Sequence, residues 1–234
     1  MTSQKTRRST MLQVMALGTA CAVRVNSNGH SIDQAGSEVN TVNSNPRLFS
    51  FLGGTAGIWR ATRNSAITGE RLPDINALDI VSGNAENERQ DATWLLQGVT
   101  SNERYVNRAE KGSLLAKQQG LGRADSNCGV LILIRKNAAW WGLTQDERRL
   151  ILEEESRHIA IGLEYLPAIA RRLHHCRDLS ESQPFDFLTW FEFADEHSEL
   201  FDQLLERLRA SKEWQFVDRE VEFRFRRDVS AETK

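Results

Sequence analysis

Cysteine is scarce in this chain. The 234 residues include three cysteines, Cys21, Cys128 and Cys176, and no two of them form a Cys-x-x-Cys pair. Cysteines this few and this scattered exclude a disulfide framework and argue against a thiolate zinc site. Whether Cys128 and Cys176 pair depends on the fold, so the sequence leaves that question open.

An excess of positive charge is also missing. The 30 Lys and Arg residues are balanced by 32 Asp and Glu residues, for a net charge of −2 at pH 7, and no long basic run occurs. Because nucleic-acid binding depends on clustered positive charge, we expect no nucleic-acid partner. The hydrophobic content of 40% and charged content of 26% are typical of a globular protein.

No apolar run is long enough to cross a bilayer as a helix, so we expect no membrane partner. The N-terminal apolar run covers residues 11–23, whereas a span needs about 20 residues. Basic residues at 5–8 precede this run and Ala-Cys-Ala at 20–22 ends it. This order is typical of an export leader and predicts cleavage after about residue 22 and a periplasmic location. A frayed N-terminus on a cytoplasmic protein is the alternative, because polar residues dilute the apolar run.

Composition divides the chain into segments. The stretch before Pro46 is rich in Asn, Ser and Gly, which bury little surface, and is interpreted as a disordered linker. The predicted organisation is a leader at 1–22, a linker at 23–46, an N-terminal half at 47–128, a C-terminal half at 129–228 and a tail at 229–234.

Periodicity predicts an α+β fold. The first half offers strand candidates at 48–52, 58–62, 78–81 and 93–99, and a polar helix at about 101–118. The second half offers a buried strand at 129–134, a helix opened by the capping box of Thr144 and Glu147, a helix at 157–178 interrupted by Pro167, an alternating strand at 185–193, a helix from Asp195 and a final strand at 214–226. The order predicts two α+β halves around antiparallel sheet.

Most of the residues that suggest chemistry lie in the second half. A neutral imidazole at His158 suits iron, and a carboxylate such as Glu213 could accept the hydrogen of its other ring nitrogen. Lys136 could neutralise that carboxylate, and the Trp pair at 140–141 could line a flat cofactor. A lone His beside apolar residues is more often structural, however, and charges at element ends are more often solvated.

Arg171 follows His158 by thirteen residues. In an unbroken helix the two would lie roughly 20 Å apart and project about 140° from each other. They could therefore not coordinate one metal together, but they could flank a flat macrocycle, particularly if Pro167 bends the path. A guanidinium stays charged at any accessible pH, so Arg171 could hold a small anion but not act as a base.

Six segments of the second half stand out together: Lys136-Asn137-Ala138-Ala139-Trp140-Trp141, Glu147-Arg148, His158, Ala168-Ile169-Ala170-Arg171-Arg172-Leu173, Phe185-Asp186-Phe187-Leu188-Thr189-Trp190-Phe191-Glu192 and Lys212-Glu213-Trp214. These segments closely resemble the chlorite dismutases, and the resemblance extends weakly from about Leu48 and strongly from about Thr93 to Arg226. They occur in the family's order with compatible spacing. The short folded length resembles the truncated, dimeric branch of that family.

The resemblance implies two ferredoxin-like halves that form a dimeric α+β barrel, with a reduced N-terminal half and one haem b per subunit in the C-terminal half. It implies that His158 is the axial iron ligand and Arg171 the catalytic distal residue. The cofactor-binding residues implied by the same motifs are Lys136, Trp140, Trp141, Leu173, Thr189, Phe191 and Glu213, with Asn102 and Tyr105 at the haem edge or propionates. Glu220 departs from the longer members, which carry an aromatic residue there.

The resemblance also implies an oxidoreductase that converts chlorite to chloride and dioxygen, with Arg171 retaining a hypochlorite intermediate, and a homodimer as the assembly. One alternative is a coproheme decarboxylase or peroxidase-like relative, although such relatives typically carry glutamine at the position of Arg171. A non-enzymatic haem-binding protein and a cofactor-free barrel of the same fold are the others.

Three further motifs are interpreted as structural. His174-His175-Cys176 resembles a metal-binding tract, but adjacent residues on a helix diverge, so we expect these side chains on a helix surface. The acidic run at 153–155 is expected on a solvated helical face. Gly120 and Gly122 lack a preceding strand and phosphate-loop spacing, so they are expected to end a helix.

Overall fold

The structure is a computed structural model. It describes residues 24–25, 31–32, 45–86, 92–100 and 104–228. The chain falls into two units, Met1–Asn43 and Ser44–Lys234.

The first unit contributes one short described feature. Strand β1 (Arg24–Val25) pairs antiparallel with β2 (Ser31–Ile32). The predicted leader at 1–22, most of the remaining linker and the tail at 229–234 lie outside the described residues. These segment boundaries therefore stay predictions.

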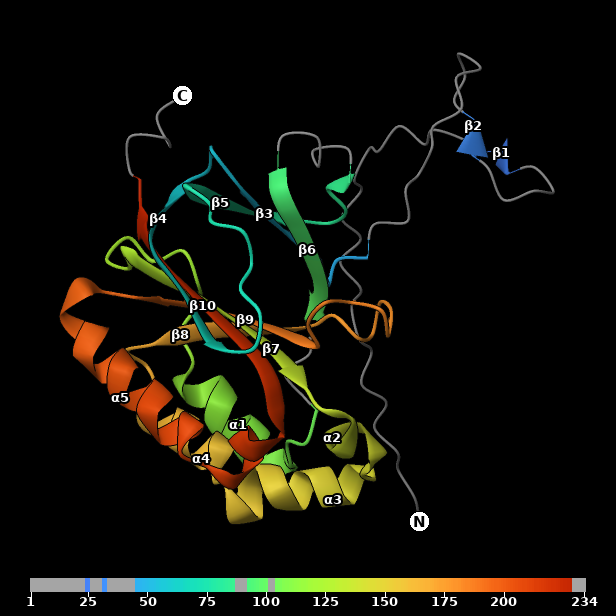
Figure 1. Ribbon diagram of the computed structural model, residues 1–234, viewed down its shortest axis with the longest axis vertical. Helices are drawn as coiled ribbons and strands as arrows, with labels where there is room; N and C mark the ends of the chain where they lie inside the picture. Colours follow the sequence, from blue (N-terminus) through green and yellow to red (C-terminus); the bar gives the residue numbers. More distant parts are fainter. Residues whose placement is uncertain (1–23, 26–30, 33–44, 87–91, 101–103, 229–234) are drawn as a thin grey trace, which may run out of the picture. The chain divides into compact units, whose positions relative to one another are not determined.

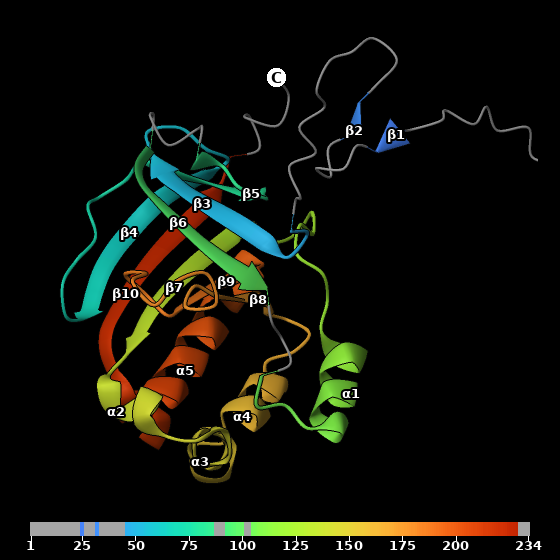
Figure 2. The ribbon, with the colours of Figure 1, turned by 90° about the vertical axis from the view of Figure 1, so that its right-hand side faces the viewer.

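The second unit is built around a closed antiparallel barrel of eight strands (Figures 1 and 2). The strands are β3 (Leu48–Gly54), β4 (Trp59–Thr68), β5 (Ala77–Ser82), β6 (Ala92–Thr100), β7 (Cys128–Lys136), β8 (Ala170–His175), β9 (Phe187–Phe193) and β10 (Val217–Arg227). Their order around the barrel is β10-β4-β5-β3-β6-β8-β9-β7. The halves β3–β6 and β7–β10 have the same internal order, in which the fourth strand lies beside the first, then the third, then the second.

Alternation along the strands separates an inner and an outer core. In β7, Leu131 and Leu133 belong to the core inside the barrel, with Phe51, Trp190 and Phe223. The intervening residues of β7 belong to a second core, between the outer face of the sheet and the helices. Both faces of β7 are therefore buried, which explains why its sequence is a continuous apolar run.

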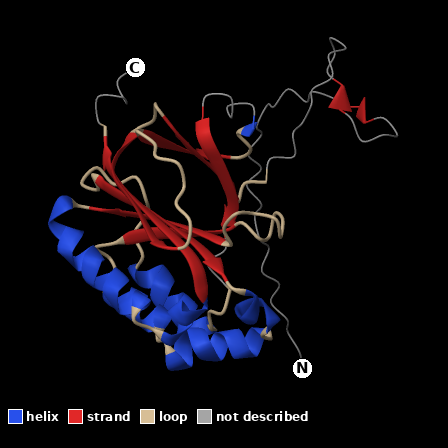
Figure 3. Ribbon diagram, in the orientation of Figure 1, coloured by secondary structure: helices blue, strands red, loops and turns tan. Residues whose placement is uncertain are grey.

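The helices gather on one side of the barrel (Figure 3). They are α1 (Arg108–Lys117), α2 (Ala138–Gly142), α3 (Gln145–Arg149), a π-helical segment (Leu150–Glu155), α4 (His158–Glu164), α5 (Ser198–Arg209) and two 3₁₀ turns (Asp195–His197 and Lys212–Phe216). The predicted capping box of Thr144 and Glu147 is confirmed. Among the described residues, every helix is too short or too polar to span a bilayer.

The prediction of a helix over 157–178 is wrong for the second part of that segment. Helix α4 ends at Glu164, and Ala170–His175 forms strand β8, paired to β9 on one edge and to β6 on the other. Pro167 lies in the connection, where its missing N–H and its ring are incompatible with a continuing helix. The helical distance expected between His158 and Arg171 therefore does not apply.

The surface position predicted for His174-His175-Cys176 is also wrong. The exposed fractions of these residues are 0%, 2% and 2%, because β8 lies within the barrel sheet. Cys128 and Cys176 are both free thiols, so they do not pair.

His174 is buried in its neutral form. The hydrogen on Nδ1 is assigned from its contact of 3.1 Å with the carbonyl of Leu188, and Nε2 accepts from Nε of Arg172 at 3.1 Å. The pKa of His174 is lowered to about 3: burial is the main cause, the bond to Leu188 opposes it, and the nearby charges of Arg172 and His175 add to the lowering. An unfolded histidine titrates near pH 6.5, so the unfolded chain binds this proton and the folded chain does not.

We therefore expect an acid-sensitive stability from His174. Because the folded-state pKa is depressed, the contribution of neutral His174 to the free energy of unfolding is fully present above about pH 6.5. It is lost progressively as the pH falls toward 3, by about 2 kcal/mol between pH 7 and pH 5. The variant His174→Asn keeps a donor for the Leu188 carbonyl but does not titrate. Urea unfolding at both pH values should show about 2 kcal/mol less acid loss in the variant; an equal loss in both proteins would contradict the assignment.

Candidate functional site

A pocket lies between the outer face of the barrel and the helices α1, α4 and α5. It contains about 1150 Å³ of empty space, including space open to solvent. Its sheet wall comes from three neighbouring strands: Leu173 of β8 faces Thr189 of β9, and Thr189 faces Ile132 of β7. Because side chains alternate along a strand, every second residue of each strand reaches the pocket.

His158 enters the pocket at the beginning of α4. Arg157, just before it, has a left-handed φ of 54°, which turns the chain between the π-helical segment and α4. The carboxylate of Glu153 accepts the backbone N–H groups of Ile159 (2.7 Å) and Ala160 (3.2 Å). These bonds satisfy amide groups that a helix leaves free at its N-terminus, so they fix the start of α4 and the position of His158.

Glu213 and Lys136 hold the ring of His158. Nδ1 of His158 lies 2.6 Å from Oε2 of Glu213, and Nζ of Lys136 lies 2.8 Å from Oε1 of the same carboxylate. The N–H of Glu213 donates to Ser156 Oγ at 2.8 Å, and Lys136 and Glu213 are 4% and 5% exposed. With Nδ1 engaged by a carboxylate, the second ring nitrogen of His158 remains as a potential ligand.

The ionised form of Glu213 is strongly favoured over the protonated form. Burial by itself raises the pKa of Glu213, but the nearby charges of His158 and Lys136 and the hydrogen bonds from both outweigh it and lower the pKa to about 2. Glu213 is therefore a carboxylate at neutral pH. A buried carboxylate paired in this way acts as a fixed negative charge behind the imidazole.

The two adjacent tryptophans occupy different places. Trp140 lines the pocket and lies beneath Lys136, whose Nζ is 4.8 Å from the ring centroid. The indole N–H of Trp140 is buried and has no hydrogen-bond partner among the described residues. Trp141 does not line the pocket: its ring stacks on Phe187, and its N–H donates to Asp186 at 3.2 Å.

Arg171 reaches the pocket from the outer face of β8. Its guanidinium packs so closely on α4 that a Cβ added to Gly162 would lie 2.2 Å from Nη1. Its side chain makes no hydrogen bond or ion pair within the part of the chain that the structure describes, and burial lowers the pKa of Arg171 below its usual value. An arginine remains protonated even so, so the pocket contains an uncompensated positive charge.

Comparison with known proteins identifies the family. No protein-family model matches the chain. A crystal structure described as a dimeric chlorite dismutase from Nitrobacter winogradskyi is 49% identical, with a TM-score of 0.71, and the match covers 76% of this chain and 99% of that one. The chain belongs to the chlorite dismutase family. The protein is therefore a member of a family of enzymes.

Other chlorite dismutases match more distantly. The chlorite dismutase of Ideonella dechloratans is 31% identical over 107 residues, which is 45% of this chain and 35% of that protein. The chain thus matches only about a third of the length of that curated relative. A mutant chlorite dismutase from Candidatus Nitrospira defluvii is 17% identical, with a TM-score of 0.55 over 79% of this chain and 92% of that one, which supports the fold alone.

Most of the residues that the chlorite dismutase resemblance singled out meet in this pocket. The pocket-lining members of that set are Tyr105, Lys136, Trp140, His158, Arg171, Leu173, Thr189, Phe191 and Glu213. Trp141 lies behind Phe187 rather than in the pocket, and Asn102 lies outside the described residues.

Sequence reasoning missed three polar or aromatic residues of the chlorite dismutase pocket. His175, Arg104 and Trp214 all line it. A period of two from Arg171 includes His175, but the helix predicted over this segment does not place alternate residues on one face. Nη2 of Arg104 lies 2.8 Å from each carboxylate oxygen of Asp178, and no local pattern indicates that contact.

Proposed function

We propose that this enzyme binds haem b in the pocket and decomposes chlorite to chloride and dioxygen. The observation that carries the proposal is the pairing of two features in one pocket: His158 with Nδ1 tied to a buried carboxylate, and Arg171 with an uncompensated charge. Membership of the chlorite dismutase family supports the same activity.

The residues present fit a haem. The pocket opens to solvent and most of the side chains that line it are apolar, which suits a flat, largely apolar cofactor. Within the described ranges, no cluster of three or more His, Cys, Asp or Glu side chains could hold a bare metal ion. A haem iron needs only one or two protein ligands, since the porphyrin supplies the others. The buried indole N–H of Trp140 also needs a partner, and a bound ligand or water would provide one.

His158 would hold the haem iron through its second ring nitrogen, and Glu213 and Lys136 would hold the imidazole in place. A carboxylate that accepts the Nδ1 hydrogen fixes the tautomer and increases the electron donation of the imidazole. Strong donation lowers the reduction potential of a haem and favours its ferric state. A bound haem supplies a redox-active iron centre that can take up and return an oxygen atom.

Arg171 would bind the anions of the reaction. Chlorite contains all the atoms of the products: its chlorine is reduced to chloride while its two oxygens are oxidised and joined as dioxygen, so no external oxidant or reductant is required. Arg171 carries a positive charge that can hold chlorite and then retain the hypochlorite formed when the first oxygen is transferred. The apolar walls at Leu173 and Phe191 limit water, which strengthens this attraction.

We also propose the finer features of fold and assembly. The β7–β10 half has the order strand, helices, strand, strand, helix, strand, which supports a ferredoxin-like interpretation of the haem-binding half. The β3–β6 half would be its reduced counterpart. The description of the Nitrobacter protein as dimeric supports a homodimer, and the N-terminal leader pattern motivates a periplasmic location.

An oxygen electrode tests the proposal. Protein reconstituted with haem b should show a Soret band and release one dioxygen per chlorite consumed. A Soret band without oxygen release would instead indicate a haem-binding protein without this activity. Conversion of iron coproporphyrin to haem b in the presence of peroxide, again without oxygen from chlorite, would indicate a decarboxylase. A protein that stays colourless would refute the cofactor.

A further inference from the structure

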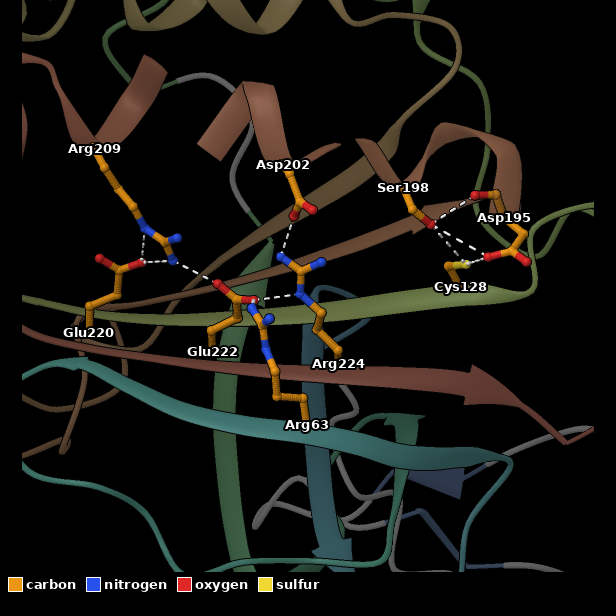
Figure 4. A network of polar contacts seen from close by, with 9 residues as sticks. All are labelled: Arg63, Cys128, Asp195, Ser198, Asp202, Arg209, Glu220, Glu222 and Arg224. Carbon is orange, nitrogen blue, oxygen red and sulfur yellow. Dashed lines mark hydrogen bonds and ion pairs between the residues drawn. The ribbon is translucent and has the colours of Figure 1, made fainter. Parts of the chain in front are cut away.

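Two glutamates of β10 are fully buried on the face of the strand that lies under α5. Glu220 and Glu222 are both 0% exposed. Figure 4 shows Arg209 of α5 reaching both of them: its Nε lies 2.9 Å from Glu220 Oε1, and its Nη2 lies 2.8 Å from Glu222 Oε2. A buried ion pair contributes little net stability by itself, because desolvation offsets the attraction. The ion pairs of Arg209 with the two buried glutamates therefore indicate a role other than holding α5 on the sheet.

The two carboxylates differ in their other partners. Glu222 binds two further arginines, Arg63 at 2.6 Å and Arg224 at 2.5 Å (Figure 4). Glu220 instead accepts the indole N–H of Trp214, which lies 2.7 Å from its Oε2. Glu222 thus joins β4, β10 and α5, whereas Glu220 contacts a residue that lines the functional pocket.

Trp214 connects Glu220 to the group that holds His158. Its ring lines the pocket, and Nζ of Lys136 lies 5.5 Å from the ring centroid. Lys136 therefore has Trp214 and Trp140 as aromatic neighbours, and these rings together with Glu213 define the position of its ammonium. The contacts run without a gap from Arg209 through Glu220, Trp214, Lys136 and Glu213 to Nδ1 of His158.

We propose that Glu220 is a positioning residue for His158: by orienting the indole of Trp214, it fixes Lys136 against Glu213 and so sets the hydrogen bond that Glu213 accepts from the imidazole. The inference rests on the proposed function for its effect on iron, but the contacts themselves do not depend on a cofactor. Orientation matters here because an ammonium displaced from Glu213 leaves that carboxylate more strongly bound to His158.

The test uses the full chain and a matched pair of variants. Glu220→Leu removes the acceptor for Trp214, and Glu220→Gln retains an amide oxygen that can accept the indole N–H. Glu222→Leu is the control, because Glu222 is equally buried and shares Arg209 but is not bonded to Trp214. Three signals are recorded: the indole N–H resonance of Trp214, the ammonium resonance of Lys136, and the iron–histidine stretching frequency of the haem-loaded protein.

Glu220→Leu should shift all three signals. Glu220→Gln should give values much closer to those of the wild type, and Glu222→Leu should leave all three near the wild-type values. Trp214→Phe should produce the same change in the iron–histidine frequency as Glu220→Leu, and the double variant should add nothing further. Equal shifts in the Glu220 and Glu222 variants, or no shift in Lys136 when Glu220 is changed, would overturn the inference. If Glu220→Leu does not fold, Glu220→Gln and Trp214→Phe carry the same comparison.

Failure of the proposed function gives a different result. A chain that does not bind haem gives no iron–histidine signal in any variant, whereas the two resonances of Trp214 and Lys136 still report on Glu220. Intact coupling in those resonances together with an iron–histidine frequency that stays constant in a loaded protein would reject the positioning role alone.

Discussion

Replacing His158 with glycine is expected to abolish oxygen release from chlorite and to weaken haem binding by more than about 100-fold. Changes to residues that merely support a metal ligand already lower metal affinity or activity by about 10- to 100-fold, so loss of the ligand itself should cost more. His158 is the first residue of α4 and its side chain is 30% exposed, so the fold should survive the change. Glu213 keeps its partner Lys136, so no buried charge is left unpaired. Haem titration and the oxygen electrode measure the two effects.

Imidazole added to the His158→Gly variant should restore part of the haem binding and activity, because it can occupy the space of the lost ring and donate the same hydrogen bond to Glu213. His175 is the matched control, since it is the other histidine that lines the described pocket. His175→Gln should keep the spectrum of an axial histidine. Loss of that spectrum in His175→Gln, with an unchanged spectrum in His158→Gly, would show that His175 and not His158 is the ligand.

Arg171→Ala is expected to leave haem bound but to lower turnover by about 100- to 1000-fold, which is the usual cost of removing one group that stabilises an anionic intermediate. Oxygen yield per chlorite should fall, and the enzyme should inactivate after fewer turnovers, because hypochlorite then escapes and oxidises the protein. Added methionine, which consumes hypochlorite, should prolong activity in the variant far more than in the wild type.

Arg171→Lys separates charge from shape. An ammonium keeps the positive charge but lacks the planar fork of a guanidinium, so turnover and oxygen yield should lie between those of the wild type and Arg171→Ala. An oxygen yield and inactivation rate unchanged in Arg171→Ala would remove Arg171 from the mechanism.

The strands that bury an apolar face could be predicted from the sequence, and β8 could not. In β7 and β9 one face or both are apolar, so continuous or alternating runs appear in the sequence. In β8, Arg171 and His175 face the pocket while Arg172 and His174 face the barrel interior, so neither face is uniformly apolar. Its apolar residues, together with those of α4, happen to match a helical spacing. The pairing of β8 with β9 and β6, which is non-local, decides its structure.

The candidate site shows the same division between local and non-local information. Residue types and motif order predicted that His158, Glu213 and Lys136 act together, although 55 residues separate His158 from Glu213 and 77 separate Lys136 from Glu213. Nothing in their spacing gives the contact; the resemblance to the chlorite dismutases suggested it, and β7 and the turn before β10 bring the groups together. The bond between Glu220 and Trp214 was not foreseen, because a buried glutamate and an exposed one have the same local sequence pattern.

Isotope labelling of the product dioxygen tests the central claim most directly. Chlorite carrying ¹⁸O in both positions is given to the haem-loaded enzyme in unlabelled water, and the released gas is analysed by mass spectrometry. If Arg171 retains hypochlorite until the oxygen–oxygen bond forms, the dioxygen is doubly labelled. Singly labelled or unlabelled dioxygen would mean that an oxygen atom comes from water, and the account of a retained intermediate would be wrong.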